Sequence, residues 1–449
     1  MNLPSNGYYL TSKDFMDFQD YFITMYDGQN CSEGCDRCLS TLLVKTITFV
    51  VTERCNLNCS YCYETHKSGK VMTKDIAKKA VDFILNKRKL NGYIKFNDSP
   101  AVILEFIGGE PLLEIDLIDY IVDYFRFRAF ELGISWADNY MVSITSNGIL
   151  FDTPKVQSFL RKNKGRVSLG ITIDGNRDLH DACRRFPDGR GSYDIVESAV
   201  KKGLKLGIQE STKMTISPTN VMYLSAALQN LWGLGLRGAY ANCIYEEGWT
   251  IEHAKILFDE MIKLADFLLK NKNFSKYWTS LFDETIGQEL IEDKNWCGGN
   301  GEMLAIGTDG KLYPCIRFMQ YSLSTPCREE KSIGSIETGI LLENEWLEQL
   351  KRITMSSQSE EKCNTCPIAS GCSLCTGYNY DKFGDPNKRA TYICIMHQAR
   401  VLANRYFFKR LYNLIDSNKE FKLNVPEGWA LNIIQKKEYL RLCGDLNAL

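Results

Sequence analysis

Short apolar runs alternate with amphipathic segments between residues 45 and about 245. The runs are rich in β-branched and aromatic side chains, a composition typical of buried strands. They predict strands at residues 45–52, 102–107, 140–146, 167–174, 208–216 and 238–245. Because these strands alternate with helical segments, we expect an α/β fold with a parallel sheet and right-handed crossovers. Active sites of such folds lie at the carboxyl ends of the strands.

Helix signals occupy the intervening segments. Thr73 is suited to cap a helix whose apolar face carries Ile76, Ala80, Val81, Ile84 and Leu85. The run Asp152-Thr153-Pro154 predicts a second helix, with proline in its first turn. Both signals place helices between predicted strands, as a parallel sheet requires.

These patterns divide the chain into five segments. Residues 1–44 are polar and aromatic, residues 45–250 hold the strand–helix repeats, and residues 251–296 form a mostly helical bridge. Residues 297–400 combine cysteines with turn residues. Residues 401–449 are a tail that begins with an amphipathic helix carrying Val401, Leu402, Tyr406 and Phe407.

Composition narrows the function classes. The chain has 449 residues, 44% of them hydrophobic, and a net charge of −1, so charge gives no argument for nucleic acid or membrane binding. No apolar run reaches membrane-spanning length, and the start lacks the basic and apolar parts of a signal peptide. We therefore expect a cytoplasmic protein. Its 17 cysteines then indicate metal sites rather than disulfides.

The central motif is a group of three thiols, Cys55, Cys59 and Cys62, on the loop that leaves the first predicted strand. Their spacing, C-x3-C-x2-C, lets them close on three corners of one cubane iron–sulfur cluster. Such clusters usually have four cysteine ligands, so one iron keeps an open position for chemistry. A structural zinc is the alternative for this motif.

A second trio with the same spacing, Cys31, Cys35 and Cys38, competes with the first. It follows a turn-like segment instead of an apolar strand, and no aromatic residue precedes its third cysteine as Tyr61 precedes Cys62. We therefore expect the second trio to be a minor metal site or a set of free thiols.

The segment CNLNCSYCYE, directly after an apolar strand, resembles the cluster motif of the radical S-adenosylmethionine (SAM) enzymes. The resemblance implies that SAM binds the open iron of a [4Fe–4S] cluster through its amino and carboxylate groups. Reductive cleavage of SAM then yields a 5′-deoxyadenosyl radical. It also implies a partial (β/α)6 TIM-type barrel, and catalytic roles for Cys55, Cys59 and Cys62.

Later motifs extend this resemblance. The run Gly108-Gly109-Glu110-Pro111 resembles the family element that contacts the amino group of SAM. The segments Thr145-Ser146-Asn147-Gly148, Thr172-Ile173-Asp174-Gly175, His180-Asp181-Ala182-Cys183-Arg184 and Gly191-Ser192-Tyr193 follow the family order. By this likeness Thr172 contacts the ribose, Arg184 pairs the SAM carboxylate, and Tyr61, Ser146 and Asn147 line the site. Turn chemistry and helix capping remain the alternatives for Asp174 and His180.

The cysteines after residue 296 resemble the SPASM extension, which carries two auxiliary [4Fe–4S] clusters. The resemblance gives the first cluster Cys297, Cys315 and Cys375, with either Cys327 or an open iron completing it. It gives the second cluster Cys363, Cys366, Cys372 and Cys394. Only two residues separate Cys372 from Cys375, where the family usually has three, so the assignment of these two stays open. A zinc ribbon is the alternative for the whole block.

Together the motifs predict an enzyme that modifies a ribosomally synthesised precursor peptide and forms Cys thioether crosslinks. The alternatives are carbon–carbon crosslinking, epimerisation and anaerobic sulfatase maturation to formylglycine. The last is disfavoured, because that group carries an acidic residue after the G-x4-C cysteine, whereas Ile316 stands here. A non-catalytic iron–sulfur scaffold is the alternative outside enzymes.

The expected partners are the precursor peptide with its leader and an electron donor such as flavodoxin or ferredoxin. Residues 1–44 look short for a complete leader-binding domain, so we expect the leader to dock on this segment or at the bridge. The sequence does not identify the peptide, the crosslinked carbon or the oligomeric state.

Overall fold

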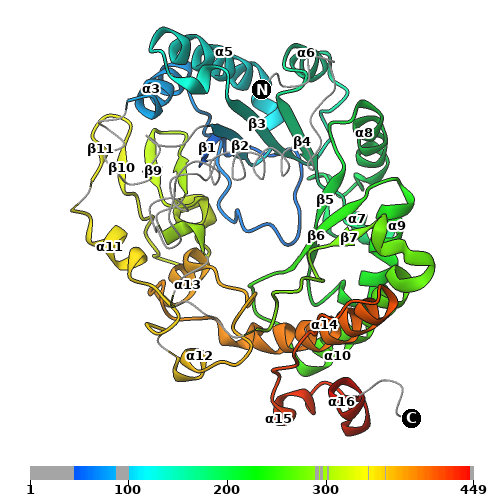
Figure 1. Cartoon of the computed structure of the whole chain (residues 1–449). Helices are drawn as coiled ribbons and strands as arrows, with labels where there is room; N and C mark the ends of the chain where they lie inside the picture. Colours follow the sequence, from blue (N-terminus) through cyan, green and yellow to red (C-terminus); the bar gives the residue numbers. More distant parts are fainter. Residues whose placement is uncertain are drawn as a thin grey trace.

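The computed structural model describes residues 45–86, 101–288, 293, 297–300, 303–341, 343–358 and 360–444. The trio Cys31, Cys35 and Cys38 lies outside the described residues. Figure 1 shows the strands following a curved path around a central space, with most of the helices outside them.

Parallel strands form the first half of the fold. They are β1 (Lys45–Thr52), β2 (Val102–Gly108), β3 (Tyr140–Ser146), β4 (Val167–Ile171), β5 (Ser211–Ile216) and β6 (Gly238–Cys243). β1 to β4 pair in sequence order, with Thr48 opposite Glu105. All six predicted strands are present, and the mixed α/β fold with a parallel sheet is confirmed.

The backbone pairing of the strands is interrupted between β4 and β5. β4 ends at Ile171, not at residue 174, and β5 begins at Ser211, not at residue 208. Side chains join the two strands here, because Thr212 Oγ1 donates to the carbonyl of Ile171 and accepts from the amide of Ile173. The assigned ladder therefore has a break, and β5, β6 and β7 (Trp278–Thr279) form a separate parallel sheet. A closed barrel is not assigned within the described residues.

Helices cover the outer face of these strands (Figure 1). They are α3 (Lys74–Ile84), α5 (Ile115–Glu131), α6 (Pro154–Lys162), α7 (Arg177–Cys183), α8 (Tyr193–Leu206), α9 (Leu224–Gly233) and α10 (Ile251–Leu269). Thr73 caps α3 as predicted, accepting from the amide of Ile76 at 3.2 Å, and α6 begins at Pro154. Ala80, Val81 and Ile84 of α3 are fully or almost fully buried, so its apolar face also matches the prediction.

The cysteine-rich segment continues the first sheet. β8 (Leu304–Ile306) pairs parallel with β1, with Phe49 opposite Ile306. The strands β9 (Lys311–Tyr313), β10 (Gly334–Ser335) and β11 (Gly339–Ile340) follow as an antiparallel meander. Within the described residues this sheet has the order β11-β10-β9-β8-β1-β2-β3-β4. The two halves of the chain thus share one sheet.

The remaining helices are α11 (Glu345–Lys351), α12 (Glu361–Asn364), α13 (Thr376–Phe383), α14 (Cys394–Leu414), α15 (Glu427–Ala430) and α16 (Lys436–Cys443). α14 is continuous across the predicted division at residue 400. It packs along α10, and Asn404 of α14 donates to the carbonyl of Leu281 at 2.9 Å. No helix in the described ranges has both the length and the apolar character needed to cross a membrane.

Candidate cluster and cofactor site

The loop with Cys55, Cys59 and Cys62 leaves the carboxyl end of β1 and is tied to the end of α7. The amide of Asn58 donates to the carbonyl of Arg185 at 2.7 Å, and the amide of Ser60 donates to that of Cys183 at 2.9 Å. All three cysteine residues are half-buried. Backbone contacts therefore fix the loop that carries them.

Charged side chains surround these thiols. Burial raises the pKa of Cys55 to about 11 and also raises that of Cys59, while the Arg184 guanidinium acts in the opposite direction at Cys59. Burial lowers the pKa of Lys67, but the charges of nearby Cys62, Cys55 and Glu64, together with a hydrogen bond to Cys62, raise it above its ordinary value overall. Sequence reasoning missed Lys67, since nothing marks a lysine five residues after the motif.

Gly108, the last residue of β2, and Gly109 directly after it allow the ends of β1 and β2 to meet. A Cβ on Gly108 would lie 2.2 Å from the Thr52 carbonyl oxygen, and one on Gly109 would lie 2.2 Å from that of Arg54. The amide of Glu110 also donates to the Arg54 carbonyl at 2.8 Å. These glycines therefore let the backbone approach both the end of β1 and the start of the cluster loop.

Glu110 connects the ends of β2 and β3. Its buried carboxylate accepts from Ser146 Oγ at 2.8 Å, the amide of Asn147 at 2.8 Å and the amide of Leu112 at 3.0 Å. Asn147 Nδ2 in turn donates to Asn56 Oδ1 at 2.7 Å and lies 3.9 Å from Cys55 Sγ. A carboxylate has about four acceptor sites, so Glu110 retains capacity for one further donor.

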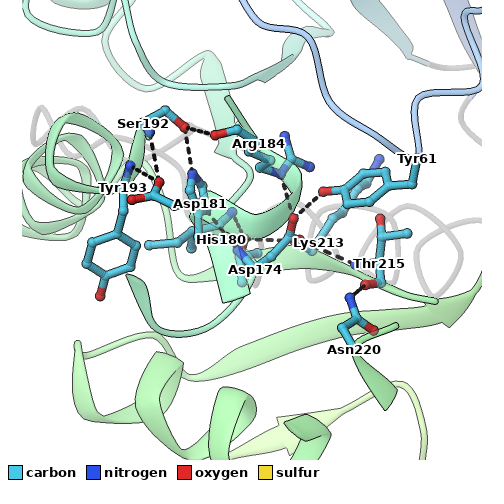
Figure 2. A network of polar contacts seen from close by, with 12 residues as sticks. Tyr61, Asp174, His180, Asp181, Arg184, Ser192, Tyr193, Lys213, Thr215 and Asn220 are labelled. Atoms are coloured by element: carbon cyan, nitrogen blue, oxygen red, sulfur yellow. Dashed lines mark hydrogen bonds and ion pairs between the residues drawn. The ribbon is translucent and has the colours of Figure 1, made fainter. Parts of the chain in front are cut away.

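Arg184 lies beside the cluster loop in a buried ion pair (Figure 2). Its Nε donates to Asp174 Oδ2 at 2.6 Å, and the Tyr61 hydroxyl donates to the same oxygen. The Arg184 guanidinium carbon lies 5.4 Å from the centre of the Tyr61 ring. Asp174 therefore orients both the arginine and the aromatic residue that precedes Cys62.

His180 and Ser192 hold the backbone of Arg184 (Figure 2). Ser192 Oγ donates to the Arg184 carbonyl at 2.8 Å, so His180 Nε2, 2.9 Å away, must donate to Ser192. His180 Nδ1 then accepts from the amide of Asp174 at 3.3 Å. Burial lowers the pKa of His180 to about 4, which keeps the ring neutral. His180 and Asp174 therefore hold neighbouring groups in place, but neither is the N-cap of α7, which is Asn176.

A polar chamber of about 330 Å³ lies on the inner face of the strands, with Thr172 on its wall. Glu105 of β2 accepts from Thr48 Oγ1 at 2.6 Å, and Lys213 of β5 contributes a positive charge to the same lining. The other lining residues are Thr46, Ile103, Ser143, Ile144, Thr145, Ser168, Gly170, Ser211, Thr212 and Tyr240. Glu105, Lys213 and Tyr240 were missed, although inward-pointing charges within predicted strands were a usable signal.

The later cysteines gather in two places. Four of them line a cavity of about 230 Å³, and these are Cys363, Cys366, Cys372 and Cys394. The other group is Cys297, Cys315 and Cys375. A Cβ on Gly299 would lie 3.5 Å from Cys297 Sγ and 3.6 Å from Cys315 Cβ, and Cys297 Sγ lies 3.4 Å from Oγ1 of Thr376, the residue after Cys375. Cys372 and Cys375 thus face different groups despite their short spacing. Cys327 is exposed at a positive φ of 62°, and no described contact joins it to the group of three.

Comparison with known proteins agrees with this geometry. Residues 49–219 match the Radical SAM superfamily. This part of the chain is therefore a radical SAM domain, and the protein is an enzyme.

Its relatives are distant. The serine-type anaerobic sulfatase-maturating enzyme of Bacteroides thetaiotaomicron is 22% identical over 76% of this chain and 84% of its own length. The subtilosin biosynthesis protein AlbA of Bacillus subtilis is 24% identical over 76% of this chain and 69% of its own length.

Solved structures show the same fold. The structure titled native anSMEcpe with bound AdoMet has a TM-score of 0.63 at 18% identity, covering 83% of this chain and 99% of that one. Streptococcus suis SuiB bound to precursor peptide SuiA has a TM-score of 0.52 at 11% identity, covering 85% and 88%.

Proposed function

We propose that the chain is a radical SAM maturase that forms Cys thioether crosslinks in a ribosomally made precursor peptide. The observation that carries this proposal is the separation of the thiols into three groups, one of which lies beside the Glu110 and Arg184 networks. Sulfur-only donor sets suit iron–sulfur clusters or zinc. A group of three thiols next to a buried carboxylate and a buried guanidinium favours a cluster with an open position for SAM.

The residues of the barrel have separable roles in this proposal. Cys55, Cys59 and Cys62 would hold the cluster, which would supply a 5′-deoxyadenosyl radical from bound SAM. Glu110 would accept from the SAM ammonium with its remaining acceptor site, and Arg184 would bind the SAM carboxylate through nitrogens other than Nε. Asp174 keeps Arg184 oriented before SAM arrives. Binding of SAM therefore costs little side-chain entropy at Arg184.

The polar chamber is the proposed place for the reacting part of the peptide. Its wall includes Thr172, the proposed ribose contact, so a peptide here would lie close to the bound SAM. Glu105 and Lys213 can bind backbone amides and carbonyls or polar side chains of the peptide. The two auxiliary groups would hold clusters that accept the electron released when the thioether bond forms. Flavodoxin or ferredoxin is the proposed donor for SAM cleavage.

Anaerobic reconstitution tests the cofactor part. With reductant and SAM, the protein should contain about twelve irons per chain and release 5′-deoxyadenosine. The triple variant Cys55→Ala/Cys59→Ala/Cys62→Ala should lose about four irons and all SAM cleavage, whereas Cys443→Ala, an exposed cysteine outside all three groups, should change neither. Zinc in place of iron, or unchanged cleavage in the triple variant, contradicts the proposal.

Co-expression with a cysteine-containing precursor peptide encoded beside the enzyme tests the reaction. A thioether removes two hydrogens and protects the cysteine from alkylation by iodoacetamide. Formylglycine, the product of the sulfatase-maturation alternative, instead reacts with a hydrazide probe. Hydrazide-reactive product from a sulfatase-derived peptide would replace the thioether proposal with the sulfatase alternative.

A further inference from the structure

Each auxiliary cysteine group has its own arginine, of which Arg389 is buried and Arg317 keeps 14% of its side chain exposed. Arg389 lies on the wall of the cavity with four cysteines, and Arg317 lies beside the group of Cys297, Cys315 and Cys375. Neither arginine belongs to a motif that the sequence singled out. Removing a guanidinium from water is costly unless it faces negative charge. The placement of both arginines against cysteine sulfurs, which become negative only when they lose their protons, therefore calls for a functional explanation.

Arg389 acts on all four cysteines of its cavity. Arg389 is only 6% exposed. Its Nη2 lies 3.5 Å from Cys372 Sγ and 3.0 Å from the carbonyl oxygen of Ser373. Burial raises the pKa of the Cys363, Cys366, Cys372 and Cys394 thiols, and Arg389 opposes this at each one. The guanidinium is thus a fixed positive charge for this group.

Arg317 occupies the corresponding place at the first group. Its guanidinium carbon lies 4.9 Å from the ring centre of Tyr63 and 5.7 Å from that of Tyr378, and the side chain hydrogen-bonds to Cys375. A Cβ on Gly377 would lie 2.5 Å from Arg317 Cβ, so the glycine lets α13 approach. Glu246, a half-exposed carboxylate, forms an ion pair with Arg317 at 3.5 Å.

We propose that Arg317 and Arg389 are positioning residues that separately set the reduction potentials of the two auxiliary clusters. The inference rests on the proposed function, since it requires clusters at both cysteine groups. Net charge and hydrogen bonds to the ligand sulfurs govern the potential of such a cluster. A cation at the sulfur stabilises the more negative, reduced state and therefore raises the potential. Glu246 offsets part of the Arg317 charge, so its removal should have the opposite sign.

Potentiometric titration followed by electron paramagnetic resonance tests this on the full chain. The background Cys55→Ala/Cys59→Ala/Cys62→Ala leaves only the two auxiliary signals. In this background Arg317→Gln should shift one signal to a lower potential and Arg389→Gln should shift the other, each leaving its counterpart unchanged. Glu246→Gln should shift the Arg317-dependent signal to a higher potential, by less than Arg317→Gln lowers it.

Lysine variants keep the experiment decisive if a glutamine variant loses its cluster. Arg317→Lys and Arg389→Lys retain the charge but not the planar donor fork, so each should lower its own potential by less than full loss of the charge. Wild-type potentials in variants that retain their iron, or equal shifts of both signals, would overturn the inference. An iron content below about eight atoms per chain in the triple-alanine background, with both arginines intact, would instead indicate failure of the proposed function.

Discussion

The barrel site and the auxiliary cysteine groups are built in opposite ways. In the barrel, Arg184 already binds Asp174 and Ser146 already binds Glu110, so the geometry is set by protein contacts alone. In the cysteine-rich half, the strands are two or three residues long and the thiols meet across loops. A preorganised polar network suits repeated binding and release of SAM, whereas loops around thiols suit a permanently bound metal cluster.

Metal removal should produce the largest difference in stability between the two regions. After chelation, the loop over residues 363–375 should lose most of its protection from hydrogen exchange, because the metal no longer joins its thiols. The strands β1 to β3 should keep theirs, since their core includes fully buried Phe49 and Phe106. Mass spectrometry of the exchanged peptides measures both. Equal loss in the two regions would contradict the comparison.

Breaking the buried ion pair is expected to have the next largest effect. Asp174→Asn leaves the Arg184 charge without its carboxylate, which should lower the free energy of unfolding by about 3–5 kcal/mol and strongly reduce 5′-deoxyadenosine release. Urea unfolding and a SAM-cleavage assay give the two values. The control is Asp194→Asn, which removes the exposed ion pair with Arg177 and should change neither.

Acidification tests the neutral histidine of the barrel. Folded His180 has a pKa of about 4 against 6.5 for an ordinary histidine, so between these pH values the unfolded chain binds a proton that the folded chain does not. The barrel should therefore lose stability as the pH falls from 6.5 to 4, by about 3 kcal/mol. His180→Gln should be less stable near pH 7 but should lack this part of the pH dependence. An identical pH dependence in both proteins would exclude a buried neutral His180.

The glycine contact gives the smallest of these effects on stability. Gly109→Ala places a Cβ against the backbone of Arg54, and the resulting shift should cost about 1–3 kcal/mol and displace Cys55 from its position. Thermal unfolding and iron content measure these changes. Gly69→Ala is the matched control, because no atom lies within 4 Å of its added Cβ. Normal iron content in Gly109→Ala would show that the loop can adjust.

Much of the barrel site could be predicted because its residues follow strand ends in chain order. The run after β2, the polar residues after β3 and Arg184 after α7 meet at one edge as parallel topology requires. Lys67, Arg317 and Arg389 were not predictable in this way. They reach the thiols through loops, and a single basic residue in a loop has no periodic or spacing signal.

The sequence by itself determined the places of six parallel strands, the cap of α3 at Thr73, the start of α6 at Pro154, and the presence of three cysteine groups. These are local or periodic properties, set by side-chain alternation, capping and spacing. Only the tertiary structure decided that β8 pairs with β1 and that Thr212 joins β4 and β5. It also decided that Cys372 and Cys375 belong to different cysteine groups. These features depend on contacts between residues far apart in the chain, whose pairing no local pattern encodes.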